Sequence, residues 1–137
     1  MAKKKQKAVW AWVQTKKTFK PTEAQKAAIS AKFEPLVQRL KQNLDPVENP
    51  QTRNQCVDVF TKWWRSFYYI MQKFQCPPEG YTMPGFETGI ARLEFRGADS
   101  FDLAFYRYTG EWVVIAEGQT LEECLKAVEE DSWFQVL

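Results

Sequence analysis

The 137-residue chain predicts an α+β fold in which two long N-terminal helices pack on a three-stranded antiparallel meander, and a C-terminal helix closes one face or edge. Three observations predict it: helical periodicity in the first half, alternation in the second half, and short turns between the alternating segments. Runs of helices followed by runs of strands favour this class over an alternating α/β sheet. We expect a basic arm over residues 1–20 and a single domain over residues 21–137.

The first helix is predicted to begin at Thr22, because Thr22 and Gln25 have the spacing of a capping box. Apolar residues then recur at helical spacing over residues 29–44 and form one stripe. Pro35 lies inside that stripe, where it removes one backbone hydrogen bond and crowds the preceding turn. Because the stripe stays in phase across Pro35, we expect a helix kinked at Pro35, with two shorter helices as the alternative.

A second helix is predicted over Thr52–Gln75, after a loop that contains two prolines. Its apolar residues at helical spacing form one stripe, and further apolar residues widen the stripe around most of the helix. A helix so apolar must be buried, so we expect it to be the central element of the core. The stripe consists of Val57, Phe60, Trp64, Phe67, Met71 and Phe74.

The last third of the chain changes from a helical period to a period of two. Residues 91–95, 101–106 and 112–116 are each predicted to form a strand. The turns at residues 97–100 and 109–110 are short, so successive strands must be antiparallel.

Two further elements flank this sheet. Thr120 and Glu123 form a second capping box and predict the C-terminal helix. Residues 8–14 alternate over two apolar faces and are a candidate for an extra N-terminal strand.

Composition excludes several kinds of chemistry. The chain has no histidine, which excludes Ser–His and Cys–His nucleophilic catalysis and every zinc site that uses histidine. Its three cysteines lack Cys-x-x-Cys spacing, and no Gly-rich phosphate loop, carboxylate metal cluster or nucleophile elbow is present. We therefore expect no metal, no cofactor and no catalytic residue, and the balance is against an enzyme.

The sequence also indicates a compartment. It contains neither a signal peptide nor an apolar run long enough to cross a membrane, so we expect a cytoplasmic protein with no membrane partner. Cys56, Cys76 and Cys124 are expected to be free thiols in a reducing environment. A continuous helix over Thr52–Gln75 would hold Cys56 and Cys76 about 30 Å apart, which excludes a bridge between them.

Five short motifs occur together in this chain: TKWWR at residues 61–65, ARLEF at 91–95, YTGEW at 108–112, LEECL at 121–125 and WFQ at 133–135. In this combination the chain resembles a family of small uncharacterised bacterial proteins, over residues 22–135. The resemblance implies a bacterial, cytosolic protein and supplies no activity. Tyr108 stands where relatives carry histidine, so any chemistry performed by that histidine would be missing here.

Charge is distributed unevenly along the chain, with +7 over residues 1–26, +1 over residues 27–109 and −6 over residues 110–137. The basic and acidic ends can attract each other within one molecule or between copies. The preferred interpretation is a non-catalytic binding or assembly module, a homodimer joined through exposed aromatic residues and oriented by these charges. It depends on Thr52–Gln75 being one buried helix that leaves little room for a site.

Aromatic residues and arginines supply the candidate interface or pocket. The aromatic residues near residue 65 cover more than one helix face, so some must point away from the core unless the first helix and the sheet bury both sides. Glu94 lies between two arginines and fits an ion-pair ladder better than a general base. A pocket for a small ligand or a substrate around Arg65, Arg92 and Glu94 is the third interpretation. The full set is Trp63, Trp64, Arg65, Tyr68, Tyr69, Arg92, Glu94 and Arg107.

The basic arm supplies the second interpretation, a nucleic-acid-binding accessory protein. Lysines neutralise phosphates, and exposed tryptophan rings can stack on unpaired bases. A solubilising tail with buried tryptophans is the alternative. The residues are Lys3, Lys4, Lys5, Lys7, Trp10, Trp12, Lys16, Lys17 and Lys20.

Overall fold

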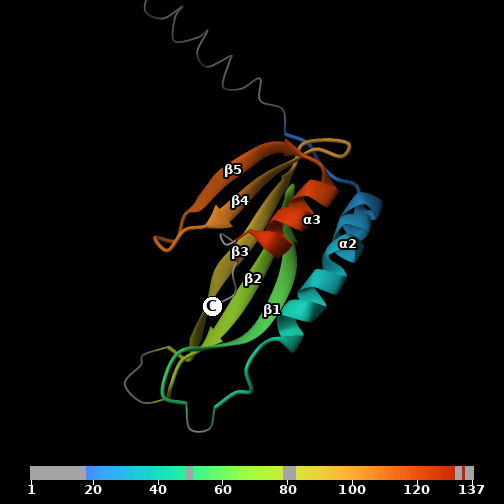
Figure 1. Ribbon diagram of the computed structural model, residues 1–137. Helices are drawn as coiled ribbons and strands as arrows, with labels where there is room; N and C mark the ends of the chain where they lie inside the picture. Colours follow the sequence, from blue (N-terminus) through green and yellow to red (C-terminus); the bar gives the residue numbers. More distant parts are fainter. Residues whose placement is uncertain (1–17, 49–50, 79–82, 132–133, 135–137) are drawn as a thin grey trace, which may run out of the picture.

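The computed structural model describes residues 18–48, 51–78, 83–131 and 134 (Figure 1). The candidate strand at residues 8–14 and most of the basic arm lie outside them. The elements are α2 (Glu23–Gln42), β1 (Gln55–Trp64), β2 (Phe67–Gln75), β3 (Gly85–Phe95), β4 (Phe101–Tyr106), β5 (Trp112–Gln119) and α3 (Leu121–Glu130). The strands form one antiparallel meander in the order β1-β2-β3-β4-β5, and both helices lie on the same face of it.

The helix predicted over Thr52–Gln75 is wrong, because this segment forms the β1–β2 hairpin. Apolar residues occupy both the helical stripe and most alternate positions, so both periods fit the segment. Many of its residues are β-branched or aromatic, and such side chains pack well on a pleated sheet. The chain reverses at Arg65, whose φ of 54° is incompatible with a right-handed helix, and Trp64 pairs with Phe67 across the turn.

The first predicted helix is confirmed as α2, and it continues without a break across Pro35. The hydroxyl of Thr22 accepts a hydrogen bond from the Gln25 N–H at 3.1 Å, and the Gln25 side chain accepts one from the Thr22 N–H at 2.8 Å. Pro35 is exposed, so its ring lies on the solvent side of the helix. The alternative of two shorter helices is excluded.

The predicted fold class is therefore wrong in its elements, although the protein does combine helices with an antiparallel sheet. The structure has one N-terminal helix rather than two, and five strands rather than three. The three predicted strands are present as β3, β4 and β5, and β3 begins six residues earlier than predicted, at Gly85.

The predicted C-terminal helix is confirmed as α3. Its capping box is formed, since the Thr120 hydroxyl accepts a hydrogen bond from the Glu123 N–H at 3.1 Å. Neither helix of the described chain is long and apolar enough to cross a bilayer.

The core lies between the two helices and the sheet. Phe33 of α2 has no exposed surface, and its ring centroid lies 5.5 Å from that of Tyr68 in β2. Cys124 and Val128 extend the core from α3. Because side chains alternate along a strand, the residues between these core positions point to the other face, which no described helix covers. We call this the open face.

Candidate binding surface on the open face

An aromatic row crosses the open face. Trp64 and Phe67 stack with ring centroids 6.2 Å apart, and Phe67 lies 6.1 Å from Tyr69. Tyr69 meets the edge of Trp112 at 5.5 Å, and Trp112 meets Tyr106 at 5.1 Å. These five residues come from β1, β2, β4 and β5, so the row spans the width of the sheet. Trp64 is the most accessible of them, with 54% of its surface exposed.

Gly89 of β3 makes room for this row. A Cβ atom on Gly89 would lie 2.3 Å from the Trp112 ring and 2.8 Å from the Tyr106 ring. Because real Cβ contacts are longer, any side chain here would displace Trp112 from the face. Glycine thus lets Trp112 reach across β4 and β3 to Tyr69.

Three cations lie on the aromatic row. The Lys62 ammonium is 5.6 Å from the Tyr69 ring centroid, and the Arg65 guanidinium is 4.4 Å from that of Trp64. The Arg92 guanidinium lies 4.7 Å from the Phe67 centroid, and its buried Nε has no hydrogen-bond partner in the described part of the protein. Among the described residues none of the three cations forms an ion pair, so rings rather than carboxylates hold them.

Two acidic side chains of the open face, Glu94 and Asp102, are matched by Arg96. Its Nη1 lies 3.5 Å from a Glu94 oxygen, and its Nε lies 3.8 Å from an Asp102 oxygen. Asp102 is 6% exposed and also accepts a hydrogen bond from the Gly118 N–H. Glu94 therefore takes part in an ion-pair ladder, and the positive charge of the aromatic row is not cancelled locally.

The structure separates the residues predicted as one interface or pocket. Trp64, Arg65, Tyr69 and Arg92 meet on the open face, beside the paired Glu94. Trp63 and Tyr68 point to the helices instead: Trp63 donates a hydrogen bond to the Ser30 hydroxyl, and Tyr68 is buried.

The remaining predicted residues lie apart from the row. Arg107 is exposed in the turn between β4 and β5. Lys20 is described and exposed, whereas Lys3, Lys4, Lys5, Lys7, Trp10, Trp12, Lys16 and Lys17 lie outside the described residues.

Sequence reasoning missed two members of this surface, Lys62 and Trp112. A hairpin with Arg65 and Ser66 in its turn would have placed Lys62 opposite Tyr69 and Trp64 opposite Phe67 on one face. Trp112 and Tyr106 face each other across the β4–β5 pair, which the predicted hairpin implied.

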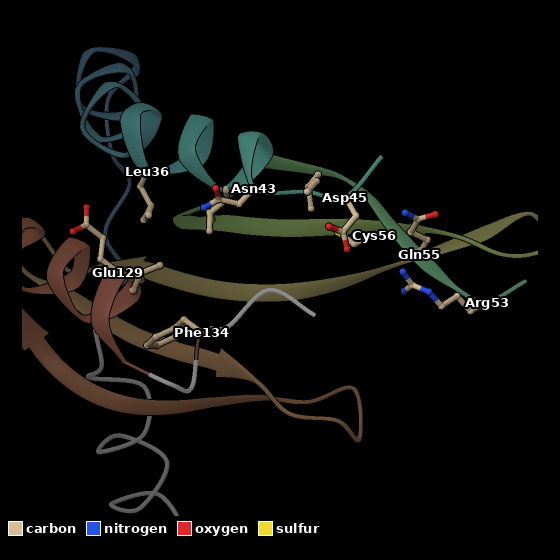
Figure 2. Close-up of a pocket in the computed structure, with 11 residues that line it drawn as sticks. Leu36, Asn43, Asp45, Arg53, Gln55, Cys56, Glu129 and Phe134 are labelled. Carbon is tan, nitrogen blue, oxygen red and sulfur yellow. The ribbon is translucent and has the colours of Figure 1, made fainter. Parts of the chain in front are cut away.

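A separate cleft opens between the end of α2, the start of β1 and the end of α3 (Figure 2). It encloses about 370 Å³, and Leu36 and Phe134 border it from opposite sides. Two of its polar side chains already have partners: Arg53 pairs with Glu48 at 3.3 Å, and the Gln55 amide donates to the Pro46 carbonyl. This pairing favours a structural role for the cleft.

The three cysteines are free, as the sequence predicted, although the helix that was to keep Cys56 and Cys76 apart is absent. All three are also buried. Burial raises the pKa of the Cys124 thiol to about 12, and the nearby acid Glu123 adds to the shift. Burial likewise raises the pKa of Cys56 and of Tyr68.

The raised pKa of Cys124 predicts a loss of stability in alkali. The unfolded chain releases the thiol proton near its ordinary pKa of 9.0, and the folded chain does so only near 12. The free energy of unfolding that the protonated Cys124 thiol contributes is therefore intact below pH 9. Between pH 9 and about 12 it falls by about 1.4 kcal/mol per pH unit. Urea unfolding between pH 8 and 11 should show a shallower fall for Cys124→Ala, in which Tyr68 and Cys56 still titrate. Equal slopes in the two proteins would contradict the assignment to Cys124.

The fold and the open face define a small α+β domain, a five-stranded antiparallel meander with helices on one face and an aromatic, cationic surface on the other. Residues 30–135 match the model of DUF3024, a domain of unknown function, and the chain belongs to this family. The expected membership in an uncharacterised family is thereby confirmed, and bacterial origin stays a prediction. No curated protein and no solved structure matches the chain.

Proposed function

We propose that this protein is a non-catalytic binding module whose open face binds single-stranded nucleic acid. The observation that carries the proposal is the aromatic row with three cations lying on it and no ion pair to them in the described chain. The buried helix on which the assembly interpretation depended does not exist, so the proposal rests on the open face instead.

Stacking supports this ligand. Proteins that bind single strands without reading their sequence combine a positive surface with aromatic rings on which successive bases stack. The centroid distances of 5.1–6.2 Å along the row keep the rings contiguous across the sheet, so an extended strand would meet one ring after another. Trp64 offers the most accessible ring at one end of the row.

Charge supports it as well. The row carries Lys62, Arg65 and Arg92, and the adjacent acids Glu94 and Asp102 are held by Arg96. A strand along the row would therefore meet positive charge. Catalysis is not favoured, because the chain lacks histidine and the open-face carboxylates described above are already paired.

Trp64→Ala should weaken binding of fluorescein-labelled dT15 and U15 by about tenfold, since a base–aromatic stack contributes about 1–3 kcal/mol. Fluorescence anisotropy measures the affinity directly. Raising the salt from 50 to 200 mM should weaken wild-type binding about 20-fold if the three cations each neutralise one phosphate.

Tyr108→Ala is the matched control, because Tyr108 is 92% exposed and lies in the turn between β4 and β5, outside the row. It should leave the affinity unchanged within about twofold. No binding of either oligonucleotide, or equal losses in the two variants, would overturn the proposal. A homodimer that persists at 200 mM salt and is lost in Trp64→Ala, by analytical ultracentrifugation, would assign the face to a second copy instead.

A further inference from the structure

A second cationic site lies at the end of the sheet, between the start of α2 and the turn that joins β1 to β2. A cavity of about 590 Å³ is lined there by Thr18, Lys20, Pro21, Glu23, Lys26, Arg65 and Ser66. Three of these residues are cations, and they come from three segments: the chain before α2, the first turns of α2, and the hairpin turn.

Its single acid does not neutralise the cavity. Glu23 lies 3.6 Å from the Lys26 ammonium, and 94% of the Glu23 side chain is exposed. Lys20 and Arg65 form no ion pair with any described residue. The cavity also adjoins the N-terminal end of the 20-residue helix α2, where the helix dipole favours an anion.

The backbone at Arg65 is a separate observation. Its φ of 54° lies in the left-handed region, which glycine and asparagine adopt with less strain than arginine. The conformation of the turn therefore does not explain why an arginine occupies this position. Its guanidinium lies over the Trp64 ring and borders the cavity, so the side chain joins this site to the aromatic row.

We infer that this cavity is a phosphate-binding site in which Lys20, Lys26 and Arg65 hold the anion. The phosphate has two sources with the same chemistry: a free phosphate or pyrophosphate ion, or the terminal phosphate of a strand that lies on the open face. The phosphate site itself does not depend on the proposed function. Only the second source, the terminal phosphate of a bound strand, depends on it.

Inorganic pyrophosphate is the probe for the site itself, measured by isothermal titration calorimetry at constant ionic strength. The double variant Lys20→Gln/Lys26→Gln should bind at least tenfold more weakly than the wild type. Arg65→Asn, which keeps a residue that tolerates the left-handed turn, should show a similar loss. Lys126→Gln on the exposed side of α3 removes one positive charge, as Arg65→Asn does, and as the control it should stay within twofold.

Oligonucleotides identify the source. If dT12 with a 5′-phosphate binds at least fivefold more tightly than dT12 with a 5′-hydroxyl, and the double variant removes the difference, the strand supplies the phosphate. If pyrophosphate binds and the 5′-phosphate makes no difference, a free anion is the ligand. No pyrophosphate binding, or a loss as large in Lys126→Gln, overturns the site even where dT15 binds to the open face.

Discussion

Phe33→Ala is expected to lower the free energy of unfolding by about 3–5 kcal/mol, the range for deleting a fully buried phenyl group. Phe33 has no exposed surface, and its ring lies against Tyr68 in the layer between α2 and the sheet. Deleting it leaves a cavity that the continuous helix and the hydrogen-bonded strands cannot easily close. Urea unfolding followed by circular dichroism measures the change.

Tyr108→Ala is again the matched control, because it removes an aromatic side chain that is 92% exposed. We expect it to change the free energy of unfolding by less than about 0.5 kcal/mol. A loss below about 1 kcal/mol in Phe33→Ala would show that α2 does not hold the sheet through this residue.

Local signals were sufficient for the elements that begin with a specific cap or alternate cleanly. The capping boxes at Thr22 and Thr120 are both formed, and helices α2 and α3 begin where they predict. The alternation over residues 91–106 places β4 and the second half of β3 correctly. In each case the residues at fixed spacing make the bonds or contacts that define the element.

The β1–β2 hairpin was not predictable in the same way. A segment that is apolar at nearly every position satisfies periods of two and of 3.6 together, so periodicity cannot choose between them. The turn itself gives no glycine, proline or asparagine signal, because Arg65 and Ser66 occupy it. Tertiary pairing with β3 decides the outcome: the Ser66 carbonyl accepts a hydrogen bond from the Phe95 N–H at 2.9 Å.

The candidate site was predictable only in part, for the same reason. Trp64, Arg65, Tyr69 and Arg92 were identified by residue type, and on a helix Arg65 and Tyr69 would share one face while Trp64 would point about 100° away from Arg65. The sheet brings them onto one face and turns Trp63 and Tyr68 to the other. The contact of Trp112 with Gly89 depends on strands far apart in sequence, and no local pattern contains it.

Arg96→Met is expected to lower the free energy of unfolding by about 3 kcal/mol, at the low end of the range for breaking a buried ion pair. The side chains of Arg96, Glu94 and Asp102 are 16%, 17% and 8% exposed, so water screens the remaining carboxylates poorly. Methionine has a similar volume and keeps the contact with the Phe19 ring, so the loss reports charge more than packing.

A second substitution separates this electrostatic cost from a packing cost. In Arg96→Met/Asp102→Asn one uncompensated carboxylate is removed, while the asparagine oxygen can still accept the Gly118 N–H. The double variant should therefore be more stable than Arg96→Met alone, and Arg107→Met at the exposed turn should change stability by less than about 0.5 kcal/mol. If Asp102→Asn lowers stability further, the role of Arg96 lies in packing rather than in holding the two acids.

In Arg96→Met the two uncompensated acids lie beside the aromatic row, so binding of dT15 should weaken as well. Unchanged affinity would show that binding to the row does not depend on local charge.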